Sequence, residues 1–127
     1  MILIAIAVGG AIGALLRYAL SNVAYRVLSA AFPWGTVMVN LSGAFAIGLL
    51  SALLDRVIVA PYVRTFLLIG LIGSFTTFST YMIESVNLLQ DQEYGLAALN
   101  IVLSTLLGLL LVFAGMIAGR AIMGIRQ

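Results

Sequence analysis

Long apolar stretches separated by short polar turns dominate the chain and predict four membrane-spanning helices. The first runs from about Ile2 past Arg17 as far as Leu28, the second from Gly35 to Leu54, the third from Pro61 or Tyr62 to about Leu89, and the fourth from about Gly95 to Ile122. At roughly 1.5 Å per residue, each crosses a hydrocarbon core of about 30 Å. We therefore expect a single membrane domain over residues 1–127.

Composition agrees with a membrane protein and removes several kinds of chemistry. Hydrophobic residues make up 64% of the chain and charged residues 8%, whereas soluble domains are only about half apolar. Cysteine and histidine are absent, which excludes disulfides, thiolate metal sites and a histidine base. The sequence contains no nucleophile–base pair or phosphate loop, and its arginines are scattered. We expect neither an enzyme nor a nucleic-acid-binding protein.

Loop charges indicate the orientation only weakly. Four spans place both termini and the second loop on one side of the membrane. That side carries Arg56, Arg64, Arg120 and Arg126, and the other carries Arg26 and, near its interface, Arg17. This excess is a small bias under the positive-inside rule. Two interpretations stay open: termini in the cytoplasm, or insertion in both orientations to give an antiparallel dimer.

Small residues recur at spacing four in two places, which predicts close helix packing. The segments Gly9–Gly13 and Gly115–Gly119 each begin and end with glycine. Such pairs let helix backbones approach closely where hydrophobicity cannot drive association. Because four short spans bury little surface by themselves, we also expect an oligomer.

The segment from Gly70 to Tyr81 is the most unusual part of the chain. It lies within a charge-free stretch, yet half of its residues carry side-chain hydroxyls. Polar groups at membrane depth are costly unless they face protein, water or an ion, so this segment indicates a working site. Its glycines and threonines are poor helix formers. Either the helix breaks here and frees carbonyls, or it stays intact with hydroxyls bonded four residues back.

Polar and small residues also form stripes along two other spans. The second span carries Thr36, Asn40, Ala44 and Gly48 at spacing four, and the fourth carries Asn100, Ser104 and Gly108. Residues four apart share a helix face. For Ser104 or Thr105 alone, ordinary helix–helix hydrogen bonding is the favoured explanation. For Asn40, whose amide has two donors near mid-span, a pore or ligand role is favoured.

Two aromatics and two ionisable residues complete the candidates. Phe78 and Tyr81 are three residues apart and share a helix face. Their ring edges are electropositive and could approach an anion, although packing is the commoner use of such pairs. Arg17 and Glu84 are the ionisable residues nearest to membrane depth, and a structural or vestibule role is favoured for both.

Three ordered motifs are similar to those of the Fluc (CrcB) family of fluoride channels. Gly9–Tyr18 is similar to its first-helix pattern GxxxGAxxRY, Gly35–Gly43 to its second-helix pattern GTxxxNxxG, and Gly70–Tyr81 to its third-helix pattern GxxGxxTTFSTF. They occur in the family's order, in a chain of the right length. By this resemblance the chain is identified as a member of the family.

The resemblance implies a fold, partners and a function. It implies an all-α membrane protein of four transmembrane helices with a broken third helix, assembled as an antiparallel dual-topology homodimer with two pores. A Na⁺ ion, structural and not transported, is expected at the dimer centre. The implied activity is passive, selective export of fluoride from the cytoplasm through the bacterial inner membrane, which confers fluoride resistance.

The resemblance also assigns roles to single residues. The main-chain carbonyls of Gly73 and Thr76 would hold the Na⁺ ion, and Arg17 takes the place of the structural first-helix arginine. The residues expected to line the fluoride pore are Asn40, Thr77, Phe78, Tyr81 and Ser104. The last of these rests on a helix without a strong motif.

Position 81 departs from the family pattern, which usually has phenylalanine there. A phenol keeps the polarised ring edge but adds a hydroxyl that needs a hydrogen-bond partner. That hydroxyl could donate to fluoride, bond a neighbour or narrow the pore, and the sequence leaves these alternatives open.

Two other functions fit parts of the sequence. A small multidrug exporter also has four spans and dual topology, but it needs a carboxylate in its first span, and residues 2–28 contain no acid. A non-conducting accessory subunit would explain the packing glycines but not Asn40 and the segment Thr76–Phe78. A fluoride channel therefore explains the most features.

Overall fold

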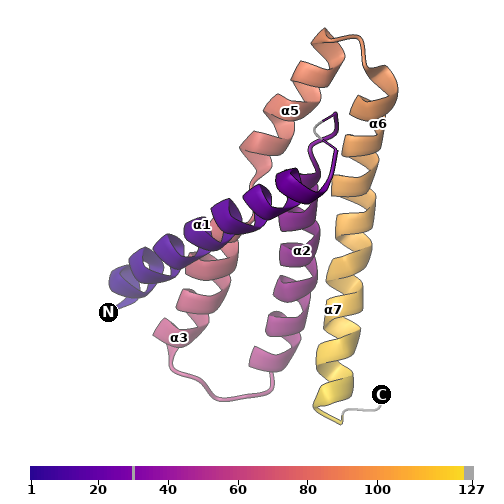
Figure 1. Ribbon diagram of the computed structural model, residues 1–127. Helices are drawn as coiled ribbons and strands as arrows, with labels where there is room; N and C mark the ends of the chain where they lie inside the picture. Colours follow the sequence, from indigo (N-terminus) through magenta and orange to yellow (C-terminus); the bar gives the residue numbers. More distant parts are fainter. Residues whose placement is uncertain (30, 125–127) are drawn as a thin grey trace.

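The computed structural model describes residues 1–29 and 31–124, which contain helices and connecting turns (Figure 1). Within these residues, four helical spans are long and apolar enough to cross a membrane. They are Ile2–Val27, Trp34–Leu54, Pro61–Gln90 and Tyr94–Ile122. The four predicted spans are thus confirmed, with ends that differ by about one residue. Arg126, used in the charge comparison, lies outside the described residues.

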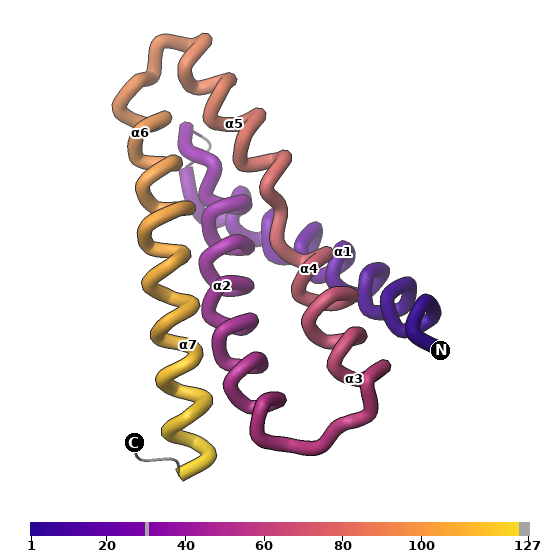
Figure 2. The backbone as a smooth tube through the Cα atoms, turned by 180° about the vertical axis from the view of Figure 1, so that it is seen from behind, coloured from indigo at the N-terminus to yellow at the C-terminus, as the bar shows by residue number. Residues whose placement is uncertain are grey.

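The first two spans are uninterrupted α-helices. α1 (Ile2–Val27) runs obliquely across the other helices, and its N-terminal end projects to one side (Figures 1 and 2). α2 (Trp34–Leu54) begins after Pro33 and lies between the third and fourth spans in both views. α2 can therefore carry side chains toward both of its neighbours.

The third span consists of four helical pieces. α3 (Pro61–Thr65) starts on a proline, whose missing N–H is not needed in a first turn. It continues into the π-helix η1 (Phe66–Ile72) and the short α4 (Gly73–Phe75). After two residues of extended backbone, α5 (Phe78–Gln90) completes the span.

The fourth span also changes its helical type midway. α6 (Tyr94–Val102) leads into the π-helix η2 (Leu103–Leu107), and α7 (Gly108–Ile122) follows. A π turn closes hydrogen bonds over one more residue than an α turn, and such turns are frequent at functional sites. The sequence pattern predicted neither π-helix.

The glycine pairs pack as predicted. A Cβ on Gly13 would clash with the carbonyl oxygen of Leu71, which brings α1 onto the third span. A Cβ on Gly115 would clash with the carbonyl oxygen of Phe45, which brings α7 onto α2. These backbone-to-backbone contacts are the close approach that small residues allow in membrane helices.

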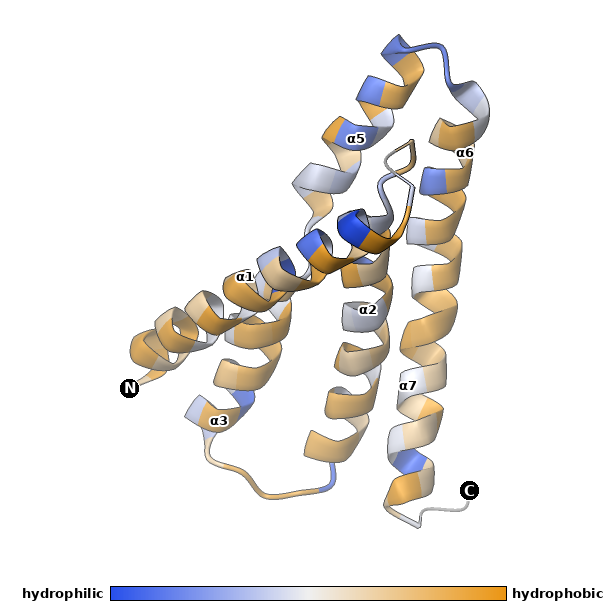
Figure 3. Ribbon diagram, viewed as in Figure 1, coloured by the Kyte–Doolittle hydropathy of each residue, from blue (hydrophilic) through white to orange (hydrophobic). Residues whose placement is uncertain are grey.

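The outer surface of the protein is largely apolar. Polar positions gather in α5, in the turn between α5 and α6, and in the second half of α1 (Figure 3). Large apolar side chains such as Leu3, Ile69 and Leu110 are more than half exposed. Because lipid solvates such side chains, this exposure is expected of a membrane protein.

Candidate functional site

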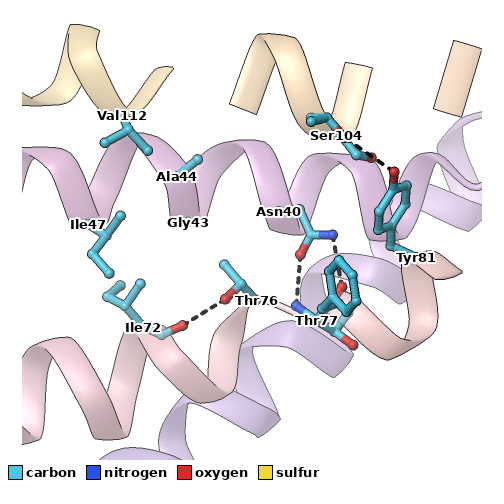
Figure 4. A pocket seen from close by; sticks show the side chains of 12 residues that line it. Asn40, Gly43, Ala44, Ile47, Ile72, Thr76, Thr77, Tyr81, Ser104 and Val112 are labelled. Atoms are coloured by element: carbon cyan, nitrogen blue, oxygen red, sulfur yellow. Dashed lines mark hydrogen bonds between the residues drawn. The ribbon is translucent and has the colours of Figure 1, made fainter. Parts of the chain in front are cut away.

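A pocket of about 420 Å³ lies where α2, the third span and the fourth span meet; we call it the central pocket (Figure 4). One end is apolar, with Ile47, Ile72 and Val112. The polar lining residues are Asn40, Thr76, Thr77, Tyr81, Ser104 and Thr105. None of the residues lining this pocket carries a formal charge, so an occupant would meet neutral groups only.

The backbone of the third span is extended at two residues beside this pocket. Thr76 has φ −75° and ψ 156°, and Thr77 has φ −142° and ψ 114°. α4 ends at Phe75 and α5 begins at Phe78, with Thr77 as its N-cap. Polar backbone groups freed in such a segment need partners when they lie at membrane depth.

Asn40 provides two of those partners. Its Oδ1 accepts a hydrogen bond from the backbone N–H of Thr77 at 2.8 Å, and its Nδ2 donates to the carbonyl oxygen of Thr77 at 3.0 Å. Figure 4 shows both bonds. Since an amide NH₂ group has two protons, one N–H of Asn40 is left beyond this pairing. Asn40 thus clamps the extended segment and lines the central pocket.

Carbonyl groups of the third span lose their ordinary helical donors at the extended segment, among them those of Gly73 and Thr76. In an α-helix the N–H of Thr77 would bond Gly73, but it donates to Asn40 instead. The N–H of Thr80 would bond the carbonyl of Thr76, but it donates to Thr77 Oγ1 at 3.3 Å. The two carbonyls that the resemblance assigned to Na⁺ are therefore among those that the interruption of the helix releases from α-helical bonding.

The threonine hydroxyls next to the extended segment are already engaged. Thr76 Oγ1 donates to the carbonyl of Ile72 at 3.3 Å, which is the bond four residues back. Thr77 Oγ1 donates to Thr80 Oγ1 at 2.9 Å. A hydroxyl bonded four residues back, that of Thr76, therefore stands beside the extended backbone of Thr77.

Phe78 and Tyr81 form an edge-to-face pair, with ring centroids 5.8 Å apart and an interplanar angle of 66°. Tyr81 is 6% exposed, whereas Phe78 is 73% exposed. The phenol oxygen of Tyr81 lies 3.3 Å from Thr105 Oγ1. Of the three alternatives for this hydroxyl, the structure shows the bond to a neighbour.

The fourth span faces α5 through a chain of polar groups. Asn100 is fully buried, and its Nδ2 donates to Ser85 Oγ at 3.0 Å. Ser85 donates to the carbonyl of Tyr81 at 2.8 Å. Ser104 Oγ donates to Asn100 Oδ1 at 3.4 Å and lines the central pocket. The sequence placed Asn100 in a polar stripe but gave no signal for its partner on α5.

A second pocket, of about 480 Å³, contains the ionisable residues. Arg17, Thr36 and Glu84 line it, and Thr77 lines both this pocket and the central one. Glu84 Oε1 accepts hydrogen bonds from Thr36 Oγ1 at 2.7 Å and from Tyr25 Oη at 3.1 Å. Arg17 and Glu84 therefore lie outside the central pocket, on the other side of Thr77.

Comparisons with known proteins agree with this architecture. The family model described as "CrcB-like protein, Camphor Resistance (CrcB)" matches residues 4–116. The chain belongs to the CrcB family. The match begins in the first span and ends within the fourth. The protein is thus a multi-pass membrane protein.

Curated relatives of this CrcB family chain cover nearly its whole length. A protein named "Fluoride-specific ion channel FluC" from Magnetococcus marinus is 48% identical, over 92% of this chain and 96% of its own. Proteins of the same name from Solidesulfovibrio magneticus and Geobacter sulfurreducens are 45% and 44% identical, over 92% and 93% of this chain and 94% and 96% of their own. The name describes an ion channel and not an enzyme.

Most of the predicted site residues of this CrcB family chain line the central pocket, and one of the two residues assigned to Na⁺ does not. All five residues expected in the pore line the central pocket: Asn40, Thr77, Phe78, Tyr81 and Ser104. Thr76 joins them there, whereas Gly73 lies in α4 and does not line the pocket. Sequence reasoning did not name Thr105 as the neighbour that bonds Tyr81, and it missed the contact of Glu84 with Thr36.

Proposed function

We propose that this chain forms a fluoride-selective passive channel. The observation that carries the proposal is the central pocket, an uncharged cluster of hydrogen-bond donors at membrane depth whose backbone is clamped by Asn40. Relatives named as fluoride-specific ion channels, at 44–48% identity over nearly the whole chain, support it. Polar groups at this depth in a membrane are energetically costly, and contact with a permeating ion would account for their presence.

The lining chemistry suits a small, strongly hydrated anion. Fluoride must exchange its water shell for other donors, and the remaining N–H of Asn40 and the hydroxyls of the pocket are neutral donors. The edges of aromatic rings carry partial positive charge, so Phe78 and Tyr81 can also face an anion. Because no cation lines the pocket, binding stays weak enough for the ion to leave, as conduction requires.

Most of these donors are already bonded within the protein, which also keeps anion binding weak. The hydroxyl of Thr77 donates to Thr80, and that of Ser104 donates to Asn100. To accept a hydrogen bond from such a hydroxyl, a fluoride ion must replace the acceptor to which the hydroxyl now donates. The loss of that internal hydrogen bond offsets part of the binding energy of fluoride, so the ion is held weakly and can leave the pocket.

An antiparallel homodimer is the assembly that we propose. Phe78 is 73% exposed although it lines the central pocket, so a second copy of the chain would supply the missing wall. The weak charge bias between the two loop sides is compatible with insertion in both orientations. In such a dimer each copy would contribute one clamped, extended segment to the shared interface.

A structural Na⁺ ion fits the diverted carbonyls. Gly73 and Thr76 have carbonyl groups whose helical donors bond elsewhere, and carbonyl ends of interrupted membrane helices hold Na⁺ in transporters. Two carbonyls from each copy would form the site at the dimer centre. A cation there would offset the partial negative charge at the C-terminal ends of the interrupted helices.

Removal of Na⁺ should therefore weaken the dimer. We expect replacement of Na⁺ by N-methylglucamine to lower the melting temperature in detergent and to stop fluoride flux. A ligand at 100 times its Kd stabilises a fold by about 2.7 kcal/mol. In Gly73→Val, where a branched side chain stands beside the carbonyl, the melting temperature should no longer depend on Na⁺. A wild-type protein that melts and conducts identically in both buffers would contradict the cation site.

Export follows from the acid–base chemistry of fluoride. Hydrogen fluoride is a weak acid that enters cells as a neutral molecule and ionises in a less acidic cytoplasm. A passive channel in the bacterial inner membrane would let the trapped anion leave down its gradient, which gives fluoride resistance. No energy source is needed for this direction of transport.

Ion efflux from liposomes tests the channel directly. Purified protein is reconstituted into liposomes loaded with fluoride or with chloride, and loss of each ion is followed with ion-selective electrodes. We expect fast fluoride loss and negligible chloride loss. Loss of neither ion from a correctly folded dimer would favour the non-conducting accessory subunit, and equal loss of both would remove the selectivity.

A further inference from the structure

Tyr81 places a buried phenol hydroxyl beside the fourth span, and Thr105 provides its partner. The phenol oxygen lies 3.3 Å from Thr105 Oγ1, and Tyr81 is 6% exposed. A buried phenol normally requires a hydrogen-bond partner, because its O–H has left water. Figure 4 shows the bond running from Tyr81 toward the fourth span, next to Ser104.

Thr105 stands opposite Tyr81 because of the local helix type and a second tie nearby. It lies in η2 (Leu103–Leu107), where a wider π turn brings consecutive side chains, Ser104 and Thr105, toward the same pocket. One turn earlier, the buried Asn100 bonds Ser85, which in turn bonds the carbonyl of Tyr81. Hydrogen bonds thus join α5 to the fourth span at two places about one turn apart.

The bond to Thr105 also determines how the ring of Tyr81 lies. The ring is attached to the backbone at one end and to Thr105 at the other, so its long axis cannot swing. In this position it meets Phe78 edge to face at 5.8 Å. Without Thr105, the hydroxyl would have to find another partner inside the central pocket.

We propose that Thr105 is a positioning residue for conduction: it binds the hydroxyl of Tyr81, so that the ring edge and not an unpaired phenol faces the permeating anion. The inference rests on the proposed function. On this inference Thr105 supplies the hydrogen-bond partner that the hydroxyl of Tyr81 requires. Thr105 is therefore needed for conduction only while position 81 carries a hydroxyl.

The test measures initial fluoride efflux from liposomes for a set of four proteins: wild type, Thr105→Val, Tyr81→Phe and the double variant. Valine keeps the shape of threonine and removes only the hydroxyl. We expect Thr105→Val to slow efflux roughly tenfold, as when a buried hydroxyl loses its partner. Tyr81→Phe sets the reference rate for a ring without a hydroxyl at position 81, and the double variant should conduct at that same reference rate.

Two controls separate positioning from general damage. Thr105→Ser retains a hydroxyl and should keep wild-type flux. Thr65→Val makes the same chemical change on α3, at a residue that does not line the central pocket, and should also be silent. Size-exclusion profiles establish that each variant is folded and assembled, and Thr105→Ala replaces Thr105→Val if valine disturbs folding.

The outcomes separate this inference from the proposed function. Equal efflux rates for the double variant and Tyr81→Phe support positioning, because a loss at Thr105 that did not depend on the tyrosine hydroxyl would persist when position 81 is phenylalanine. An equal loss in both backgrounds, no loss in either, or a tenfold loss in Tyr81→Phe alone would overturn it. A wild-type protein without fluoride flux would overturn the proposed function and, with it, this inference.

Discussion

We expect Asn40→Asp to abolish fluoride flux while the protein stays folded. Asparagine donates to the Thr77 carbonyl and accepts from the Thr77 N–H. Aspartate keeps the acceptor but puts a carboxylate in the proposed path of the anion. Two like charges 4 Å apart repel by about 4 kcal/mol at an effective dielectric constant near 20, which corresponds to roughly a thousandfold in rate. Fluoride efflux from liposomes is the measurement.

Asn87→Asp is the matched control for that experiment. It makes the same chemical change at an exposed residue of α5 that does not line the central pocket. We expect this variant to conduct like wild type. Normal flux through a folded Asn40→Asp protein would remove Asn40 from the proposed conduction path and leave it a backbone clamp only.

The second large effect is expected on stability. Gly115→Ala should destabilise the protein by roughly 1–3 kcal/mol, the usual cost of overpacking. Its new Cβ would clash with the backbone carbonyl of Phe45 on α2. A backbone atom cannot move aside as a flexible side chain can, so α7 and α2 must separate. We expect a lower melting temperature in detergent and a smaller folded fraction on size exclusion.

Gly108→Ala isolates the clash from the helix propensity. Both glycines lie in α7 and both gain about 1 kcal/mol of propensity on becoming alanine. A Cβ on Gly108 meets only Leu41 Cδ2, at 3.9 Å, which is ordinary contact. Gly108→Ala should therefore be neutral or stabilising. If both variants melt alike, the close approach of α7 to α2 does not govern stability.

The sequence predicted the fold at the level of single helices. Span length and apolar content depend on local composition, so the four spans were found to within about one residue. The glycine pairs at Gly9–Gly13 and Gly115–Gly119 also predicted packing, because only small residues permit backbone contact there. The π-helices η1 and η2 escaped prediction, since their hydrogen bonding adjusts to the packing of neighbouring spans.

The sequence predicted which residues line the candidate site better than it predicted the hydrogen bonds between them. Motifs brought Asn40 and Phe78 forward, and the polar stripe of the fourth span pointed to Ser104; the structure places all three around one pocket. Their donors and acceptors were less visible. The hydroxyl of Thr77, expected in the pore, proved to be the N-cap of α5 and a donor to Thr80. Such pairings depend on rotamers and on backbone angles that composition does not specify.

By itself the sequence determined that this is a membrane protein with four spans, and that a cluster of hydroxyl-bearing side chains lies in the middle of the third span. These properties follow from the cost of exposing polar groups to lipid, which each segment meets alone. Only the tertiary structure decided that Asn40 clamps Thr77 and that Thr105 holds Tyr81. Those bonds join residues on different spans, 37 and 24 positions apart, and exist only once the helices are packed side by side.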